Sequence, residues 1–348
     1  MKVWLTLDIN KRVYNHRPGS CRQVEGVVYG SEDIALIEDE GIAFVTSGLI
    51  HLLGRGKDVK GQIFLYDFNQ KGPYKVVPVK INGKYDKNNF HPHGISHFVR
   101  SDGGIRLFVI NHSKKFEHSV MVFDWDRKSK ELNLVRIITD DKFIRPNDLA
   151  AVSENAFILT NDGSAQTTFT SFIEELLMIP TGSVMYYDGK ASSWLIAKTR
   201  TPNGIFLHPD RKHLVVSHAS AERISIYGLK KNYHSVSHVL DIPLLTLTDN
   251  VFVDKDGVIW TGAHPVLKET MRHLTDCENP KINASSQVLR ITLSKDFKSY
   301  EVTEPFTDDG RFASGSSAAV TFKNQLLIGT VCRQLVHCYI SPETVATS

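Results

Sequence analysis

The sequence lacks the features that mark several large classes of protein. Its 348 residues include only four cysteines, and no two of them form a CxxC pair, which excludes the usual spacing of a zinc site. No stretch approaches the roughly 20 apolar residues that a membrane-spanning helix requires. The net charge of +3 is too small to indicate binding to nucleic acid. A GxSxG motif is also missing, so nothing indicates a nucleophilic serine.

Residues 1–20 are polar and irregular, and they predict an N-terminal arm or the stub of an anchor. The apolar stretch within residues 1–7 is too short for a complete signal peptide, so the protein is either cytosolic or made with a leader that this sequence does not contain. Residues 21–348 contain no linker. With 41% apolar and 23% charged residues in the chain, they predict a single globular domain.

The sequence does contain a sixfold repeat of a polar pair, a short apolar run, a turn and a second apolar run. Turns of Asp, Asn or Gly between β-branched or aromatic runs are typical of hairpins. The second runs cover residues 42–45, 105–110, 156–159, 213–216, 258–260 and 325–328. Hairpins at intervals of roughly 45 to 70 residues predict an all-β fold, a six-bladed β-propeller. Residues 169–178 and 266–274 predict short helices over one mouth of the ring.

The polar pair before each first run is the candidate functional feature, and we call each pair a slot. The six slots are Glu32-Asp33, His93-Gly94, Asn147-Asp148, Asn203-Gly204, Asp249-Asn250 and Ser316-Ser317. If the run after each slot is the innermost strand of its blade, all six slots open onto one end of the central channel. Oxygen donors in this number favour calcium over zinc or magnesium. The alternative is that each pair is only a turn former before a strand, but six pairs in register favour a shared metal site.

One histidine shares this arrangement. His93 occupies the second slot, where a neutral imidazole beside calcium can take a proton from water while the metal polarises a carbonyl. His112 lies on the partner strand and can orient His93 or relay its proton. A hydrogen-bonded structural histidine is the alternative. His91, His97 and His264 are further candidates.

The cysteines and one sequon complete the candidate sites. Closing the ring would bring Cys21 and Cys338 together, and a disulfide over so long a loop would stabilise the fold by about 4 to 5 kcal/mol. Four reduced thiols remain the alternative. Asn283-Ala284-Ser285 is a glycosylation sequon in a predicted surface loop, whereas Asn111-His112-Ser113 also matches but is expected to be buried.

Motifs from Cys21 to Cys338 resemble those of the paraoxonase/arylesterase family of six-bladed propellers. They are Gly30-Ser31-Glu32-Asp33, Pro92-His93-Gly94-Ile95-Ser96, Asn111-His112, Pro146-Asn147-Asp148, Thr160-Asn161-Asp162, Asn203-Gly204-Ile205, Asp249-Asn250, His264-Pro265 and Leu327-Ile328-Gly329-Thr330-Val331.

The resemblance implies hydrolysis of lactones and aryl esters, and in some members of organophosphate triesters. It implies a His93–His112 pair, a Cys21–Cys338 disulfide and two calcium ions in the channel. The catalytic ion would be held by Glu32, Asn147, Asn203, Asp249 and Asn250. The structural ion would be held by Asp33, Asp148 and the backbone carbonyl of Ile95.

The chain also departs from the family pattern. Ala263 replaces the family's free cysteine, Cys277 and Cys332 match no known role in the family, and residues 169–178 and 266–274 diverge. The resemblance implies a small ester or lactone substrate, membrane or lipoprotein association, and a location outside the cell or on the lumenal side of the endoplasmic reticulum or plasma membrane. The alternatives are a non-catalytic, membrane-associated, chaperone-like propeller that assists channel or receptor assembly, and a cytosolic lactonase of a related six-bladed family.

Overall fold

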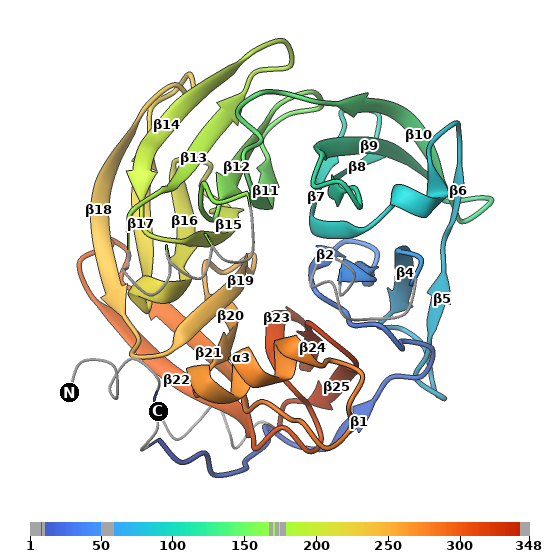
Figure 1. Ribbon diagram of the computed structural model, residues 1–348, viewed down its shortest axis with the longest axis vertical. Helices are drawn as coiled ribbons and strands as arrows, with labels where there is room; N and C mark the ends of the chain where they lie inside the picture. The colour runs from blue at the N-terminus through green and yellow to red at the C-terminus, as the bar shows by residue number, and fades with distance from the viewer. Residues whose placement is uncertain are drawn as a thin grey trace.

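Six antiparallel sheets stand around a central channel in the computed structural model (Figure 1). The structure describes Asp8, residues 11–49, 59–166, Thr170, Glu174 and residues 179–341. In each sheet the strand that follows a slot lies innermost, and the chain then runs outward strand by strand. The predicted six-bladed β-propeller is therefore confirmed.

Each blade contains four strands, and blade 2 gains a fifth. Blade 1 contains β2 (Ile34–Ile37), β3 (Ile42–Ser47), β4 (Gln62–Asp67) and β5 (Val76–Pro78). Blade 2 contains β7 (Pro92–Val99), β8 (Ile105–His112), β9 (His118–Asp126) and β10 (Glu131–Ile138), with β6 (Lys80–Asn82) added in parallel at its outer edge. Blade 3 contains β11 (Pro146–Ala151), β12 (Phe157–Asn161), β13 (Gly182–Tyr187) and β14 (Ser192–Thr199).

The remaining three blades follow the same order. Blade 4 contains β15 (Pro202–Leu207), β16 (His213–His218), β17 (Arg223–Leu229) and β18 (Val236–Pro243). Blade 5 contains β19 (Leu247–Val253), β20 (Ile259–His264), β21 (Ser286–Leu293) and β22 (Tyr300–Asp308). Blade 6 contains β23 (Ser316–Phe322), β24 (Gln325–Thr330), β25 (Leu335–Tyr339) and, from the start of the chain, β1 (Cys21–Gln23).

The two ends of the folded chain meet in blade 6. β1 pairs with β25 in a register that places Cys21 opposite Cys338, and these two cysteines form a disulfide. The pairing that the resemblance implied is confirmed, and the alternative of four reduced thiols is wrong, since the structure also pairs Cys277 with Cys332. Before β1, residues 11–20 form no strand beyond an isolated bridge from His16 to Thr307 of β22.

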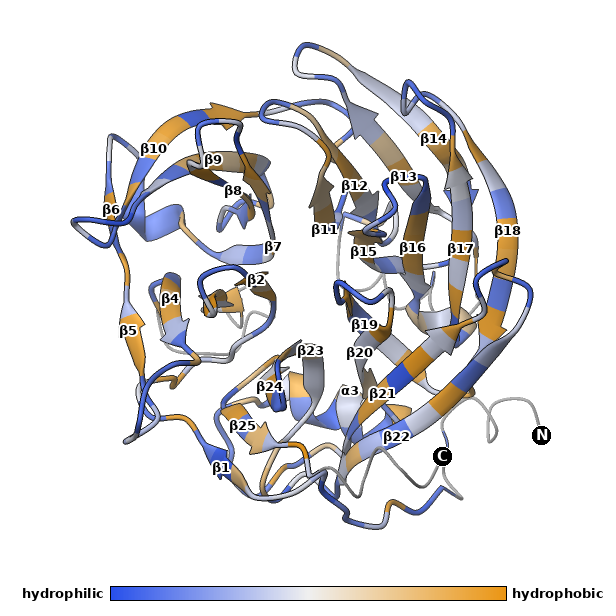
Figure 2. Cartoon of the chain, turned by 180° about the vertical axis from the view of Figure 1, so that it is seen from behind, coloured by the Kyte–Doolittle hydropathy of each residue, from blue (hydrophilic) through white to orange (hydrophobic). Residues whose placement is uncertain are grey.

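The core lies between neighbouring blades, where aromatic rings from adjacent sheets meet. Phe44 contacts Trp125 edge-on across blades 1 and 2 with 4.9 Å between ring centroids, and Phe206 contacts Phe252 at 5.5 Å across blades 4 and 5. Such pairs add roughly 0.5–1.5 kcal/mol each beyond the area that they bury. Outer strands such as β18 instead alternate hydrophilic and hydrophobic residues (Figure 2), because one of their faces meets solvent.

Of the two predicted helices, one is confirmed. α3 (Leu267–Thr275) lies after the inner hairpin of blade 5, as residues 266–274 predicted (Figure 1). The other, at residues 169–178, lies outside the described residues except for Thr170 and Glu174. The described residues also form the single 3-10 turns η2 (Lys87–Asn89) and η3 (Ala219–Ala221). Among the described residues, no helix has the length and hydrophobicity needed to cross a bilayer.

Candidate active site

Backbone irregularities mark the slots. Five of the six inner strands shift register at the slot: β7, β11, β15, β19 and β23. In β11, for example, Pro146 pairs with Asn161 but Leu149 pairs with Leu159, so Asn147 and Asp148 fall in the irregular step. Bulges of this kind redirect side chains at sheet rims and beside active sites. In these strands the register shift thus takes slot residues out of the regular pleat.

The first residue of five of the six slots borders a large cavity at one end of the channel. This cavity has a volume of about 670 Å³. We call its polar residues the cavity layer: Glu32, His93, Asn147, Asn203 and Asp249. They come from blades 1 to 5, so the structure brings together the residues that the repeat predicted to share one end of the channel.

The second residue of the slots in blades 1 and 3 lies beneath the cavity. Asp33 and Asp148 border a closed space of about 20 Å³, and we call these two carboxylates the buried layer. Asp33 accepts hydrogen bonds from the backbone N–H groups of Ile34 and Ile95, both at 2.7 Å. Asp148 repeats this pattern with Leu149 at 2.6 Å and Ile205 at 2.7 Å. Each carboxylate thus joins its own blade to the next blade.

Glycine fills the second slot position in the blades that receive these bonds. A Cβ atom on Gly94 would lie 2.6 Å from the Asn147 carbonyl oxygen and 2.8 Å from Asp148 Oδ1. A Cβ atom on Gly204 would lie 2.5 Å from the Asn250 Cα. Both distances are shorter than any tolerable contact, so the close approach of neighbouring inner strands requires glycine at these positions.

The oxygens of the slots test whether a cation fits. Among the buried side-chain atoms that have no hydrogen-bond partner are Glu32 Oε2, Asn147 Oδ1, Asn203 Oδ1 and Asn250 Oδ1. Asn250 is oriented by its Nδ2, which donates to Glu32 Oε1 at 2.9 Å and to the Glu32 carbonyl at 3.0 Å. Unsatisfied buried acceptors are rare and costly. Four of them in one ring of slots fit a hard cation that takes six to eight oxygen ligands.

The pKa values of carboxylates in both layers also indicate a cation site. Burial, with the Glu32 carboxylate nearby, raises the pKa of Asp33 to about 7. Burial, with Asp33 nearby, raises the pKa of Asp148 well above its ordinary value, and burial also raises the pKa of Asp249. A buried carboxylate is costly without an opposite charge, and the donor set therefore suits a divalent cation.

A chain of three imidazoles leads from the cavity layer into blade 2. His93 Nε2 lies 3.5 Å from Glu32 Oε1, and His93 Nδ1 lies 3.0 Å from His112 Nε2. His112 Nδ1 lies 2.7 Å from His118 Nδ1. The predicted contact of His93 with His112 is thus present in the structure, whereas the sequence analysis did not identify His118.

The protonation tendencies along this chain differ. Burial alone would lower the pKa of His93, but the carboxylates of Glu32, Asp162 and Asp249 together outweigh this effect, and the pKa is raised. Burial and the neighbouring imidazoles lower the pKa of His112 well below its ordinary value, and burial lowers the pKa of His118 to about 4. His112 and His118 are therefore neutral at pH 7, and His93 is the ring on which a proton is most stable.

The other candidate histidines have separate positions. His264 lines the cavity, and its Nε2 lies 2.9 Å from Asp249 Oδ2. His91 is buried, with its Nδ1 2.8 Å from the His112 carbonyl oxygen. His97 borders the small space of the buried layer rather than the cavity.

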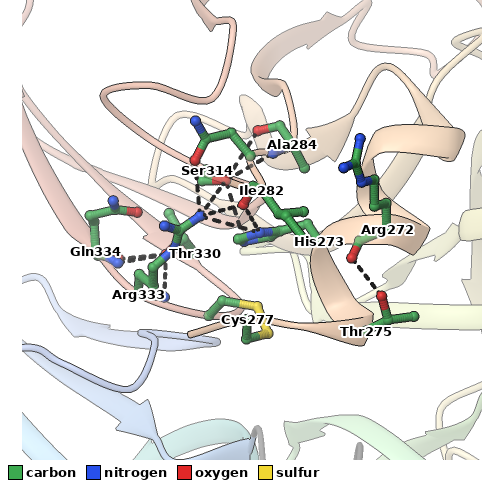
Figure 3. The surroundings of a disulfide bond; sticks show 12 residues. Arg272, His273, Thr275, Cys277, Ile282, Ala284, Ser314, Thr330, Arg333 and Gln334 are labelled. Atoms are coloured by element: carbon green, nitrogen blue, oxygen red, sulfur yellow. Dashed lines mark hydrogen bonds between the residues drawn. A yellow bond between two sulfur atoms is a disulfide. The ribbon is translucent and has the colours of Figure 1, made fainter. Parts of the chain in front are cut away.

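Helix α3 forms part of the cavity wall. Leu267, Thr270, Met271 and Leu274 line the cavity. Cys277, just after the helix, is bonded to Cys332, the neighbour of the cavity residue Val331 (Figure 3). Beside this disulfide, the Arg333 guanidinium donates to the Ile282 carbonyl at 2.8 Å, and the His273 ring lies against the same guanidinium (Figure 3). The two cysteines without a predicted role thus tie the helix to blade 6.

The two sequons occupy different surroundings. Asn283 is half-buried, and its Oδ1 accepts a hydrogen bond from the Arg333 guanidinium at 3.0 Å. Asn111 is also half-buried, and its side chain bonds the backbone of His91 and Asn89. Glycosylation of Asn283 stays a prediction.

Comparison with known proteins places the fold and the site in a family. A family profile described as arylesterase matches residues 13–340. The chain belongs to the arylesterase family. Mechanosensory abnormality protein 6 of Caenorhabditis elegans is 33% identical over 349 residues, covering 97% of this chain and 91% of that protein. Serum paraoxonase/arylesterase 2 of Gallus gallus is 32% identical, covering 92% and 88%. Serum paraoxonase/arylesterase 1 of Homo sapiens is 31% identical, covering 92% and 88%.

Solved structures resemble this arylesterase-family protein in fold. A luciferin-regenerating enzyme has a TM-score of 0.57 at 11% identity, covering 92% of this chain and 94% of that structure. The Malassezia sympodialis allergen Mala s 1 has a TM-score of 0.59 at 14% identity, covering 92% and 95%. At such low identities the likeness shows the fold alone, whereas membership of the arylesterase family supports a hydrolase.

Three polar residues of the cavity wall escaped the sequence analysis as functional groups. His118 opens β9, Arg145 precedes β11 and Asp162 follows β12; all three line the cavity. Arg145 forms an ion pair with Asp162 and a second with Glu174, whose Oε2 lies 3.3 Å from Arg145 Nη1. Of these three residues, only Asp162 belongs to a motif of the sequence, the one around Asn161-Asp162. This motif lies at the same strand end as Asn111-His112 and could have indicated that Asp162 is near the site.

Proposed function

We propose that this arylesterase-family protein is a calcium-dependent hydrolase of lactones and aryl esters, and that it also accepts organophosphate triesters. The observation that carries this proposal is the set of four unpartnered buried oxygens at Glu32, Asn147, Asn203 and Asn250. They lie in the same ring of slots as His93, which has the His112 imidazole on one side and the Glu32 carboxylate on the other.

Two ions fit the donors. Glu32, Asn147, Asn203, Asp249 and Asn250 would hold one, and Asp33, Asp148 and the Ile95 carbonyl would hold the other. When bound at the cavity layer, calcium supplies a Lewis acid that polarises the substrate carbonyl and stabilises the developing oxyanion. The buried layer joins blade 1 to blade 2 and blade 3 to blade 4, so the second ion would serve the fold.

The histidine chain supplies the base. If neutral His93 donates its Nδ1 proton to His112 Nε2, its own Nε2 keeps a lone pair at the cavity. His112 then donates from Nδ1 to His118 Nδ1, and the three rings share one direction of hydrogen bonding. His93 Nε2 takes a proton from water and keeps it, because the pKa of His93 is raised whereas those of His112 and His118 are lowered. The two neutral rings hold His93 in position, the hydroxide bonds to the carbonyl carbon, and the leaving oxygen takes the proton from His93 Nε2.

The shape of the cavity suits a small apolar ester. Its volume of about 670 Å³ lies in the usual range for small-molecule sites, roughly 300–1,000 Å³. Phe116, Leu267, Met271 and Leu274 supply apolar wall. The proposed calcium donors lie at the slots, whereas α3 supplies mostly apolar side chains, so an aryl or alkyl group would lie toward α3 and the ester carbonyl toward the cavity layer.

The first test is hydrolysis of phenyl acetate, a δ-lactone and an aryl phosphotriester by purified protein, with and without excess EGTA. Turnover should be lost on chelation and restored by added calcium. Circular dichroism recorded in parallel separates loss of the site from loss of the fold. No turnover from folded, calcium-loaded protein would refute the proposal.

A second candidate function is a non-catalytic, membrane-associated scaffold that assists channel or receptor assembly. It is favoured by the similarity to Mechanosensory abnormality protein 6, which covers 97% of this chain. The substitution His93→Gln separates the two candidates. If the protein is a scaffold, the wild type and the variant should fold and bind calcium equally well, and neither should hydrolyse esters. If it is an enzyme, the variant should lose the hydrolysis rate of the wild type.

The two disulfides support a proposal for the cellular location. Structural disulfides form and persist in oxidising compartments, and Cys21–Cys338 and Cys277–Cys332 are both paired. We therefore place the protein outside the cell or on the lumenal side of the endoplasmic reticulum or plasma membrane, with association to membranes or lipoproteins and with glycan on Asn283. A shift in mass on treatment with an endoglycosidase would test the last point.

A further inference from the structure

Two histidines and an aspartate gather at the hairpin turn between β15 and β16. His208 follows β15, Asp210 lies in the turn, and His213 begins β16. His208 Nδ1 lies 3.1 Å from Asp210 Oδ1, and His213 Nδ1 lies 2.6 Å from Asp210 Oδ2. One ligand atom from each residue lies within 4.8 Å of the other two, and within the described ranges no other three His, Cys, Asp or Glu side chains gather this closely.

This cluster is separate from the candidate active site. Asn203 of the cavity layer stands near the start of β15, whereas His208 follows its end. Five residues of extended strand span roughly 16 Å. None of the three residues lines the large cavity, so the cluster belongs to the opposite end of the inner strand of blade 4.

The turn itself fixes the carboxylate. Asp210 Oδ1 accepts hydrogen bonds from the backbone N–H groups of Lys212 at 2.7 Å and His213 at 3.1 Å. Arg211 between them has a left-handed backbone with φ of 57°. The local fold therefore holds Asp210 in place before any ligand arrives, and Oδ2 remains directed at His213.

An aromatic ring holds the imidazoles. Phe297 stacks on His213 with 4.0 Å between centroids and an angle of 26°, and it meets His208 edge-on at 5.3 Å. The side chains of His208, Asp210 and His213 are 13%, 30% and 21% exposed. They are thus restrained on one side by Phe297 and open to solvent ions on the other.

The nearest cationic side chain of the turn is engaged elsewhere. Arg211 donates to the Val152 carbonyl at 2.7 Å and to the Tyr233 hydroxyl at 3.3 Å. Its guanidinium is therefore directed toward blade 3 and toward the loop after β17. The Asp210 carboxylate keeps two imidazoles, rather than an arginine, as its side-chain neighbours.

We propose that His208, Asp210 and His213 bind one divalent cation of the zinc class. Two imidazoles and one carboxylate form the donor set of zinc sites with three protein ligands and an exchangeable fourth position, and imidazole also suits Cu²⁺ and Ni²⁺. The slots offer oxygen in excess and suit calcium instead. The chain thus carries two sites of opposite preference on one strand, and this second site does not depend on the proposed hydrolase function.

The test is a titration of ZnCl₂ into the full-length protein, saturated beforehand with CaCl₂, by isothermal calorimetry. We expect one zinc per chain, and binding at least about tenfold weaker for both His208→Ala and His213→Ala, since each removes one of three ligands. His238→Ala is the matched control, because His238 lies 2.9 Å from Asp241 in a pair that has no second imidazole nearby in the same cluster. This variant should bind zinc like the wild type.

A second measurement avoids any dependence on how the variants fold. Zinc should protect His208 and His213 of the wild-type protein from diethylpyrocarbonate, as mapped by mass spectrometry, while His238 stays reactive. Absence of stoichiometric zinc binding, unchanged affinity in a folded His213→Ala variant, or equal modification of His208 and His213 with and without zinc would each overturn the proposal.

Discussion

Neighbouring residues of the same slot lie in very different surroundings. Glu32 borders a cavity of about 670 Å³ and has one carboxylate oxygen without a partner. Asp33, the next residue, borders a space of about 20 Å³, and both its oxygens accept backbone hydrogen bonds. Asn147 and Asp148 repeat this difference in blade 3. In blades 1 and 3, the first position of the slot thus provides a free acceptor at the cavity, and the second position joins the blades.

The largest expected effect comes from removing a donor of the cavity layer. Asn203→Ala deletes an unpartnered Oδ1 that the proposed mechanism assigns to calcium, and we expect ester hydrolysis to fall by at least about 10³-fold, with stability in calcium nearly unchanged. Initial rates with phenyl acetate measure this. Asn232→Ala, the same substitution in a surface turn, is the control. Full activity of the Asn203 variant would contradict the role of this residue as a calcium donor.

The buried layer should behave in the opposite way. Asp148→Ala leaves the N–H groups of Leu149 and Ile205 without their acceptor. Since each buried unsatisfied donor costs about 1–3 kcal/mol, the free energy of unfolding should fall by about 2–6 kcal/mol. Urea denaturation in excess calcium measures the loss. If Asp148→Ala were as stable as the wild type, the buried layer would not be what joins these blades.

A buried histidine behind the cavity layer gives a pH-dependent comparison. His218 of β16 pairs with Pro202 beside Asn203, and burial lowers its pKa to about 4, against about 6.5 in an unfolded chain. A neutral His218 therefore stabilises the fold fully above pH 6.5, and this contribution, about 3 kcal/mol, is lost as the pH falls from 6.5 to 4. The difference in unfolding free energy between wild type and His218→Gln should shrink by this amount over that range. A pH-independent difference would contradict the assignment.

The smallest expected effect concerns the third imidazole. His118→Gln keeps an acceptor for His112 Nδ1 but removes the ring that orients His112 and, through it, His93, so turnover should fall by about tenfold while KM stays constant. The pH profile of kcat should also change, which a purely structural role would not cause. Lys115→Gln, on the neighbouring surface turn, is the control. An unchanged kcat and pH profile would limit the catalytic chain to His93 and His112.

The inner strands of each blade could be predicted from the sequence, and the outermost strand could not. Second strands are mostly buried and apolar, such as β8, which is set off by turn residues. Outer strands are less distinctive. β10 mixes Glu131, Asn133 and Arg136 with apolar residues because it meets solvent, and β1 has only three residues and gains its partner from the far end of the chain.

The candidate site likewise contains residues that could be predicted from the sequence and residues that could not. The oxygen donors could be predicted because the slots repeat, and the repeat placed them at one end of the channel. His118 belongs to no repeat, since it begins a third strand and reaches the cavity only through the packing of β9 against β8. Cys277 and Cys332 are 55 residues apart, and no local pattern links a residue after α3 to one after β24. Pairings of this kind depend on the completed ring.

That ring has a consequence for the order of events on the ribosome. β1 is synthesised first, yet its partner β25 is synthesised last, with Cys21 and Cys338 separated by 317 positions. Blades 1 to 5 can form in sequence as the chain emerges, but blade 6 cannot be completed until translation has nearly finished. Throughout that interval the backbone groups of β1 have no partner strand. The nascent protein must therefore keep its first strand available for the whole of its synthesis.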